Sequence, residues 1–63
     1  MLSEHVEVKA LKKLSDKVLS GDRGTVVFVY DNPRLAYEVE FFDEEGDTLE
    51  LLTVEASEIE LIQ

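Results

Sequence analysis

The sequence predicts an all-β domain, folded as a small antiparallel barrel or roll. Its clearest sign is a turn with two glycines, Gly21 and Gly24, which leads directly into the β-forming run at residues 25–30. The same order of a turn followed by a strand-like run recurs twice farther along the chain. With 63 residues and no cysteine, residues 1–63 form one domain that needs a dense core, because no disulfide can stabilise it.

Two further turns and one strand follow the first run. The sequence Asp-Asn-Pro-Arg at positions 31–34 is a strong turn signal. Residues 37–41 alternate apolar and acidic side chains, as a half-buried strand does. The acidic stretch at residues 43–47 then predicts a hairpin loop, in which Gly46 can take a left-handed conformation.

The last third of the chain predicts two more strands. Residues 48–54 form the first of them, where the adjacent Leu51 and Leu52 break the alternation and indicate a bulge or a sharp coil. Residues 58–61 alternate acidic and apolar side chains again and predict the closing strand.

The first twenty residues fit two different structures. Ser3 can cap a helix and Gly21 can end it, and apolar residues recur every four positions between them: Val6, Ala10, Leu14 and Val18. In the other interpretation, residues 5–11 form a first strand, and a long loop follows through residue 20. The local pattern does not decide between a helix and a strand.

Sequence motifs favour the strand and loop. Residues 14–27 resemble the opening of SH3-like barrels in ribosomal and transcription-associated proteins. The spaced motifs are Gly21-Asp22-x-Gly24-Thr25-Val26-Val27, Ala36-Tyr37-Glu38-Val39-Glu40-Phe41, Gly46-Asp47-Thr48 and Leu52-Thr53-Val54. Together they resemble a small bacterial family catalogued as domain of unknown function 4926.

The resemblance implies a small SH3-like barrel of about five antiparallel strands with a long first loop. The alternative fold is an N-terminal helix packed on a four-stranded antiparallel sheet. The resemblance names no catalytic residue. It implies that the protein is the antitoxin or immunity-type partner of a basic protein.

Charge is distributed unevenly along the chain. Residues 1–30 carry a net charge of +1, whereas residues 31–63 carry −10, with Arg34 as their one cation. Such an acidic surface repels phosphate backbones and favours a basic protein partner. Nucleic-acid binding is therefore not expected as the main role. The alternative function is a ribosome- or nucleic-acid-associated barrel that uses the basic first loop, with Lys9, Lys12, Lys13, Lys17 and Arg23.

The candidate partner-binding surface lies on the third predicted strand and its hairpin. Alternation turns Glu38 and Glu40 outward, and one of the adjacent Phe41 and Phe42 must face away from the core. An outward Phe42 beside acids is the arrangement of an interface anchor with a charged rim. The complete set of predicted site residues is Tyr30, Glu38, Glu40, Phe42, Asp43, Glu44 and Glu45.

Catalytic and cofactor sites are not expected. His5 is the single histidine, no cysteine is present, and fifteen acids make close carboxylate pairs uninformative. The stretch at residues 43–47 does not have the spacing of a calcium loop, so we expect no metal site. Apolar runs are too short to span a bilayer and the N-terminus lacks signal-peptide features, which predicts a cytoplasmic protein without membrane contact. Besides the basic protein partner, the small size of the domain favours a weak homodimer as a second form of association.

Overall fold

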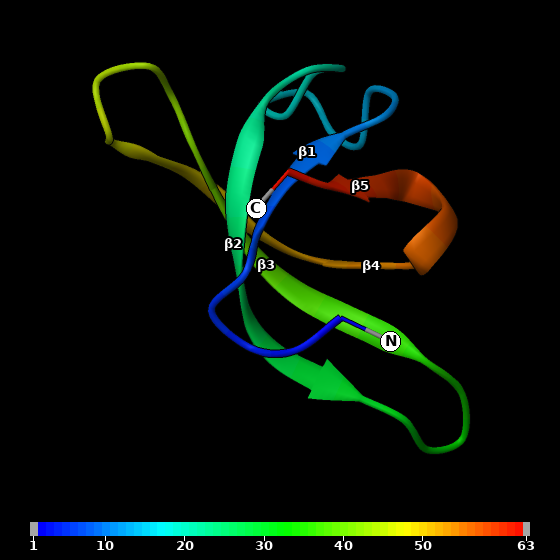
Figure 1. Ribbon diagram of the computed structural model, residues 1–63. Coiled ribbons are helices and arrows are strands. Elements are labelled where there is room, and N and C mark those ends of the chain that lie inside the picture. Colours follow the sequence, from blue (N-terminus) through cyan, green and yellow to red (C-terminus); the bar gives the residue numbers. More distant parts are fainter. Residues whose placement is uncertain (1, 63) are drawn as a thin grey trace.

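The chain forms a single five-stranded antiparallel sheet. The computed structural model describes residues 2–62, so Met1 and Gln63 of the predicted domain lie outside the described residues. The strands are β1 (Glu7–Ala10), β2 (Arg23–Tyr30), β3 (Ala36–Phe42), β4 (Thr48–Val54) and β5 (Ile59–Leu61), with a 3₁₀ turn, η1 (Ala56–Glu58), before β5. Their order in the sheet is β4-β3-β2-β1-β5, and the sheet curls into a small barrel-like fold (Figure 1). The predicted all-β class and the five antiparallel strands are confirmed.

The helix alternative for the first twenty residues is wrong. β1 pairs antiparallel with β2, where Val8 lies opposite Gly24, and with β5, where Ala10 lies opposite Ile59. Both sides of this short strand are thus hydrogen-bonded to neighbours, which outweighs the helical spacing of its apolar residues. The long loop at residues 11–22 follows, as the strand-and-loop interpretation predicts.

The long loop is held against the sheet by Val18 and Ser15. Val18 is fully buried although it belongs to no strand. The Ser15 hydroxyl accepts hydrogen bonds from the backbone N–H groups of Lys17 and Val18, at 3.2 and 3.1 Å, and donates one of 2.6 Å to Oε1 of Glu50 in β4. One side chain therefore sets the turn of the loop and connects it to β4.

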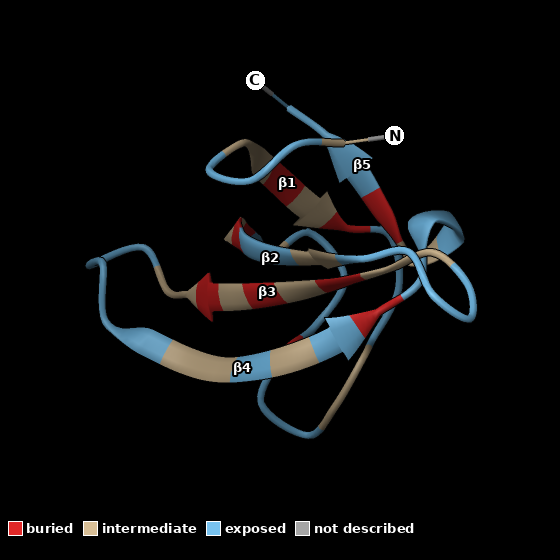
Figure 2. Cartoon of the chain, turned by 90° about the horizontal axis from the view of Figure 1, so that it is seen from below, coloured by how far each residue is buried: buried red, intermediate tan, exposed pale blue. Residues whose placement is uncertain are grey.

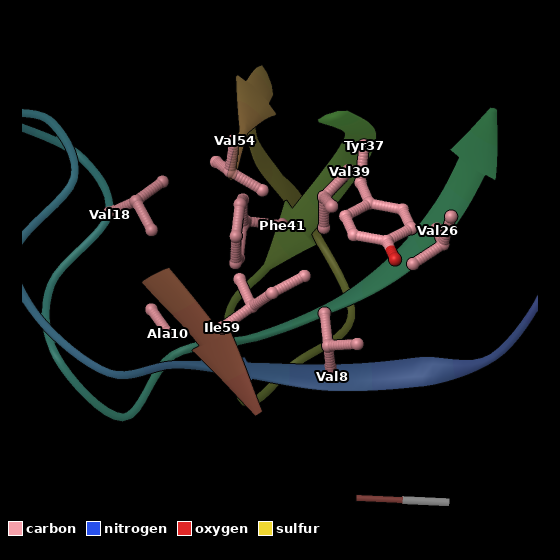
Figure 3. Close-up of a cluster of buried hydrophobic side chains, with 9 residues drawn as sticks. All are labelled: Val8, Ala10, Val18, Val26, Tyr37, Val39, Phe41, Val54 and Ile59. Carbon is pink, nitrogen blue, oxygen red and sulfur yellow. The ribbon is translucent and has the colours of Figure 1, made fainter. Parts of the chain in front are cut away.

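The core lies inside the curl of the sheet and is wholly apolar apart from one hydroxyl group. Figure 3 shows its members: Val8, Ala10, Val18, Val26, Tyr37, Val39, Phe41, Val54 and Ile59. The Tyr37 hydroxyl accepts a 3.0 Å hydrogen bond from the backbone N–H of Leu2, so this buried polar group is satisfied. All five strands and the long loop contribute to the core, which therefore depends on the whole described chain.

Gly24 lies in close contact with β3. A Cβ atom at this position would lie 2.6 Å from Cγ1 of Val39 and 2.8 Å from the carbonyl oxygen of Glu40. Both distances are shorter than van der Waals contact, so only glycine fits here without a shift of β3. Gly24, which the sequence predicts in the turn before this strand, is instead the second residue of β2, and it allows the close contact with β3.

Two irregularities decide which side chains face outward. Between Val26 and Phe28, β2 contains one residue more than β3, which shifts the register and places Phe28 opposite Glu38. In β4, Glu50 lies opposite Phe41 but Thr48 lies opposite Phe42, so the extra residue there is Leu49. The bulge predicted at Leu51 and Leu52 is wrong, because alternation continues through this pair: one side chain is exposed and the other packs against the core.

The predicted turns between the strands are confirmed. The turn after β2 contains a cis peptide bond between Asn32 and Pro33. Gly46, in the β3–β4 hairpin, has φ of 90°, a left-handed conformation that glycine adopts without strain. Within the part of the chain that the structure describes, no helix has the length and apolarity to cross a membrane.

Candidate partner-binding surface

The outer face of β3 carries a row of half-buried side chains between the core residues. Tyr37, Val39 and Phe41 are buried, and the residues between and after them are half-buried, so burial alternates strictly along the strand (Figure 2). Phe41 is therefore the core ring of the adjacent pair, and Phe42 is the one on the outer face, as predicted. Glu38 and Glu40 lie on the same face as Phe42.

Hydroxyl groups of neighbouring strands hold the two carboxylates of this row. Oε1 of Glu38 accepts hydrogen bonds from the Thr53 hydroxyl at 2.7 Å and from the Tyr30 hydroxyl at 3.2 Å. Oε2 of Glu40 accepts one from the Thr48 hydroxyl at 2.6 Å. The Glu38 carboxylate thus connects β2 and β4 across β3, whereas the Glu40 carboxylate is bonded to β4. The structure thus brings the predicted residues Tyr30, Glu38 and Glu40 together in one array.

An aromatic pair flanks the carboxylates on the β2 side. The rings of Phe28 and Tyr30 have their centroids 4.8 Å apart at an interplanar angle of 64°, an edge-to-face contact. They are 48% and 41% exposed, so much of this apolar area is open to solvent. Desolvation by its surroundings and the neighbouring Glu38 carboxylate raise the pKa of the Tyr30 hydroxyl above its usual value.

The remaining predicted residues lie at the β3–β4 hairpin and form a separate group. Phe42, Asp43 and Glu44 line a surface depression of about 540 Å³, which the start of β1 and the turn into β2 complete through Glu7, Gly21, Asp22 and Arg23. Nη1 of Arg23 lies 4.0 Å from Oε2 of Glu7, which partly balances the acids there. Glu45 borders an adjoining depression together with Asp22, Asp43 and Glu44. The predicted surface is therefore divided into an array on the outer face and an acidic hollow at the hairpin.

Three hairpin carboxylates lie close enough to hold a cation. One oxygen from each of Asp43, Glu45 and Asp47 lies within 4.8 Å of the others. However, Oδ1 of Asp43 already accepts the backbone N–H groups of Glu45 and Asp47, at 2.9 and 3.0 Å. These bonds are those of an Asx-type turn, which accounts for the position of Asp43 without an ion.

Most cations of the N-terminal half face carboxylates. Lys9 lies 3.4 Å from Glu60, Lys12 lies 3.9 Å from Glu58, and Lys13 lies 3.8 Å from Asp16. Arg23 is engaged with Glu7 as described above. Such exposed pairs add little stability, but they reduce the positive charge that the first loop offers to a phosphate backbone.

The family of the chain follows from comparison with known proteins. Residues 4–61 match the family described as Domain of unknown function (DUF4926). The chain belongs to this family. The DUF4926 match includes all five strands, the outer-face array and the hairpin hollow, so both candidate sites lie inside the family domain. Neither the curated proteins nor the solved structures gave a significant match to the chain.

Two prominent residues of the outer face were missed by sequence reasoning. Phe28 shares strand parity with Tyr30, so alternation back from Tyr30 could have indicated it. Leu51 is 52% exposed and lies opposite Glu40. Its position depends on the register between β3 and β4, which no local signal in the DUF4926 chain reveals.

Proposed function

We propose that this DUF4926 protein is a small acidic interaction module that binds a basic protein partner. The binding surface is the outer face of β2, β3 and β4. One observation carries the proposal: hydroxyl groups fix the carboxylates of Glu38 and Glu40 between exposed apolar side chains on either side. The apolar side chains are Phe28 and Tyr30 on β2 and Leu51 on β4.

This arrangement combines the two elements of a protein interface. Apolar and aromatic area supplies affinity when it is removed from water, and tyrosine is among the residues that dominate binding energy. Carboxylates within that area select a cationic partner, and the net charge of −9 speeds its approach. The surface is an open sheet face, which suits a macromolecule better than a small substrate, so we propose binding and not catalysis.

The sharper form of the proposal is an antitoxin or immunity-type role in the cytoplasm. A protein that acts on nucleic acid presents cations to phosphates. Carboxylates such as those of Glu38 and Glu40 can occupy the same cations and compete with the nucleic acid. Inhibition would then require no active site in the acidic partner.

The test is partner capture followed by quantitative binding. The protein is immobilised, partners are captured from the native host at low salt and identified by mass spectrometry, and the affinity of the purified pair is measured. We expect Glu38→Lys with Glu40→Lys to weaken binding by at least about a hundredfold, because each change replaces an attraction by a repulsion. Affinity is also expected to fall steeply as salt rises.

The matched control changes the same charge elsewhere. Glu4→Lys with Glu60→Lys adds four units of positive charge, as the test pair does, but both positions lie outside β2, β3 and β4. An equal loss in both double variants, or an association indifferent to salt, contradicts the proposed surface. Retention of oligonucleotide in a low-salt mobility-shift assay would instead support the nucleic-acid alternative through the basic first loop.

A further inference from the structure

The strand β4 lies at one edge of the sheet with one side unpaired. Its ladder to β3 runs from Thr48 to Val54, and within residues 2–62 the strand order places no other strand beside it. Figure 2 shows β4 along the outer margin of the sheet, next to β3. Among the described residues, the backbone hydrogen bonds made by loops and turns involve none of residues 48–54. The outward N–H and C=O groups of β4 are thus available to another chain.

The edge of β4 has only part of the usual protection against such pairing. Natural edge strands are blocked by lysine or proline, by a bulge or an inward-facing charge, or by being very short. In β4, the bulge at Leu49 and the inward-facing Glu50 lie near its start and leave residues 51–54 in regular pairing with β3. β4 has seven residues, none of which is lysine or proline, whereas β5 at the opposite edge has three. Leu51, in the middle of β4, exposes half of its surface. A free edge of this length with an apolar centre can accept an added strand.

The outer-face carboxylates lie within reach of a strand added to this edge. An added strand would run about 4.8 Å from β4. The Glu38 carboxylate is bonded to Thr53 of β4 as well as to Tyr30 of β2, and the Glu40 carboxylate is bonded to Thr48 of β4, so both charges lie within hydrogen-bond distance of β4 side chains. Lysine or arginine side chains on the outer face of the added strand can therefore meet them, because their stems extend farther than one strand spacing.

On the inner side of the β4 edge, an added strand would need apolar side chains. Leu49 and Leu52 pack against the core but are only partly buried. Apolar side chains on the inner face of an added strand would cover them. Since successive residues of a strand face opposite sides, the segment that fits has basic and apolar residues in alternation.

A second copy of the chain fits this edge poorly. Each copy carries a net charge of −9. An antiparallel β4–β4 pair that stacks Leu51 on Leu51 would place Asp47 opposite Glu55 at both ends. Like charges directly opposite in a ladder are destabilising.

We propose that β4 receives an extended segment of the basic partner as a sixth strand, with basic residues on its outer face and apolar residues on its inner face. This inference rests on the proposed function, and it adds the mode of recognition and the sequence pattern that is recognised. Backbone hydrogen bonds to β4 provide the register, and Glu38 and Glu40 provide the selection for cations.

A synthetic heptapeptide of alternating valine and lysine, capped at both ends, tests the proposal. It is titrated into the ¹⁵N-labelled protein by nuclear magnetic resonance. We expect shifts and slowed amide exchange at the outward N–H groups of β4. Two further peptides carry N-methyl groups on the odd or on the even residues. One of the two should bind at least about tenfold more weakly than the unmodified peptide, because only one set of amides faces β4 in an added strand.

Protein variants give an independent readout. Leu51→Lys places a cation on the β4 edge and should weaken peptide binding at least about tenfold. Leu61→Lys is its matched control, because Leu61 has nearly the same exposure, 51%, on the opposite edge strand. It should leave binding within about twofold of wild type, since the added cation lies away from β4.

The outcomes separate this inference from the proposed function. Equal binding by both methylated peptides, no binding at millimolar peptide, or equal effects of the two leucine variants overturns strand addition. If Glu38→Lys with Glu40→Lys still abolishes capture of the basic partner, the proposed function stands. If that double variant binds peptide and partner as wild type does, the proposed function itself fails. If sedimentation experiments show a dimer of the protein and Leu51→Lys dissociates it, the strand added to β4 comes from a second copy of the chain. That result would overturn the proposal of a partner segment.

Discussion

The seven residues of β3 alternate between two faces that have different surroundings. The inner face carries Tyr37, Val39 and Phe41, which are at most 1% exposed and belong to the core. On the outer face, Glu38 and Glu40 are half-buried and hydrogen-bonded to hydroxyls of β2 and β4. A strand period of two thus separates the core from the proposed binding face within one short segment. Substitutions on the outer face should therefore leave the core nearly unchanged.

The largest effect is expected at the centre of the inner face. Phe41→Ala removes a fully buried ring and should cost about 3–5 kcal/mol in the free energy of unfolding, a large part of what a small domain has. Urea denaturation followed by circular dichroism measures it. Phe28→Ala on the outer face should cost about 1 kcal/mol or less. Similar losses in both variants would contradict the division between the two faces.

The contact between β2 and β3 gives the next largest effect. Gly24→Ala forces a Cβ atom against Val39 and the backbone of Glu40, and should destabilise the fold by about 1–3 kcal/mol. Gly46→Ala is the comparison, because a Cβ atom there meets open space and its cost comes from φ alone, about 1 kcal/mol. Thermal unfolding of both variants ranks them. A Gly24 variant as stable as wild type would mean that β3 can move away freely.

The connection between the long loop and β4 should matter less. Ser15→Ala removes the hydroxyl that bonds two backbone N–H groups and Glu50, and we expect a loss of about 1 kcal/mol. Ser20→Ala, at an exposed position in the same loop, is the control and should be neutral. Amide exchange of Val18 should also accelerate in the Ser15 variant alone. Unchanged exchange there would show that the loop is held by the apolar contact of Val18.

The smallest effect concerns the tyrosine of the outer face. The pKa of Tyr30 is raised in the folded protein, so folding favours the protonated hydroxyl. The stability that Tyr30 contributes is therefore complete below pH about 10, where tyrosine is protonated in both states, and is lost as the pH rises through the higher folded pKa. Alkaline titration of the Tyr30 ring by nuclear magnetic resonance measures the shift. Glu38→Gln should lower this pKa, and an unchanged value would exclude the carboxylate as a cause.

The fold was largely predictable because its turns depend on the conformational preferences of a few local residues. The glycines at 21 and 46 and the proline at 33 lie in turns, as their conformational preferences indicate. β1 could not be decided locally, because its four residues are held by β2 on one side and β5 on the other. The bulge at Val27 could not be read either, since every residue from 26 to 30 is apolar and no alternation marks the register change.

The candidate site was predictable only in part, for a similar reason. Alternation of acidic and apolar residues indicated Glu38 and Glu40 correctly as outward side chains. Their hydroxyl partners come from β2 and β4, and the exposed Leu51 comes from β4. Those neighbours depend on registers set by the two irregularities, so they appear only when the strands are paired.

The pairing of β1 with β5 has a consequence for synthesis of the protein. Val8 lies opposite Leu61, and the core residue Ile59 belongs to the last strand. A nascent chain on the ribosome therefore cannot complete the sheet until residues 59–61 have emerged. Folding of so non-local a topology is slow compared with that of helical domains. Until that moment the carboxylates of β3 and the free edge of β4 have no finished scaffold, so the proposed binding surface is complete only after residues 59–61 have joined the sheet.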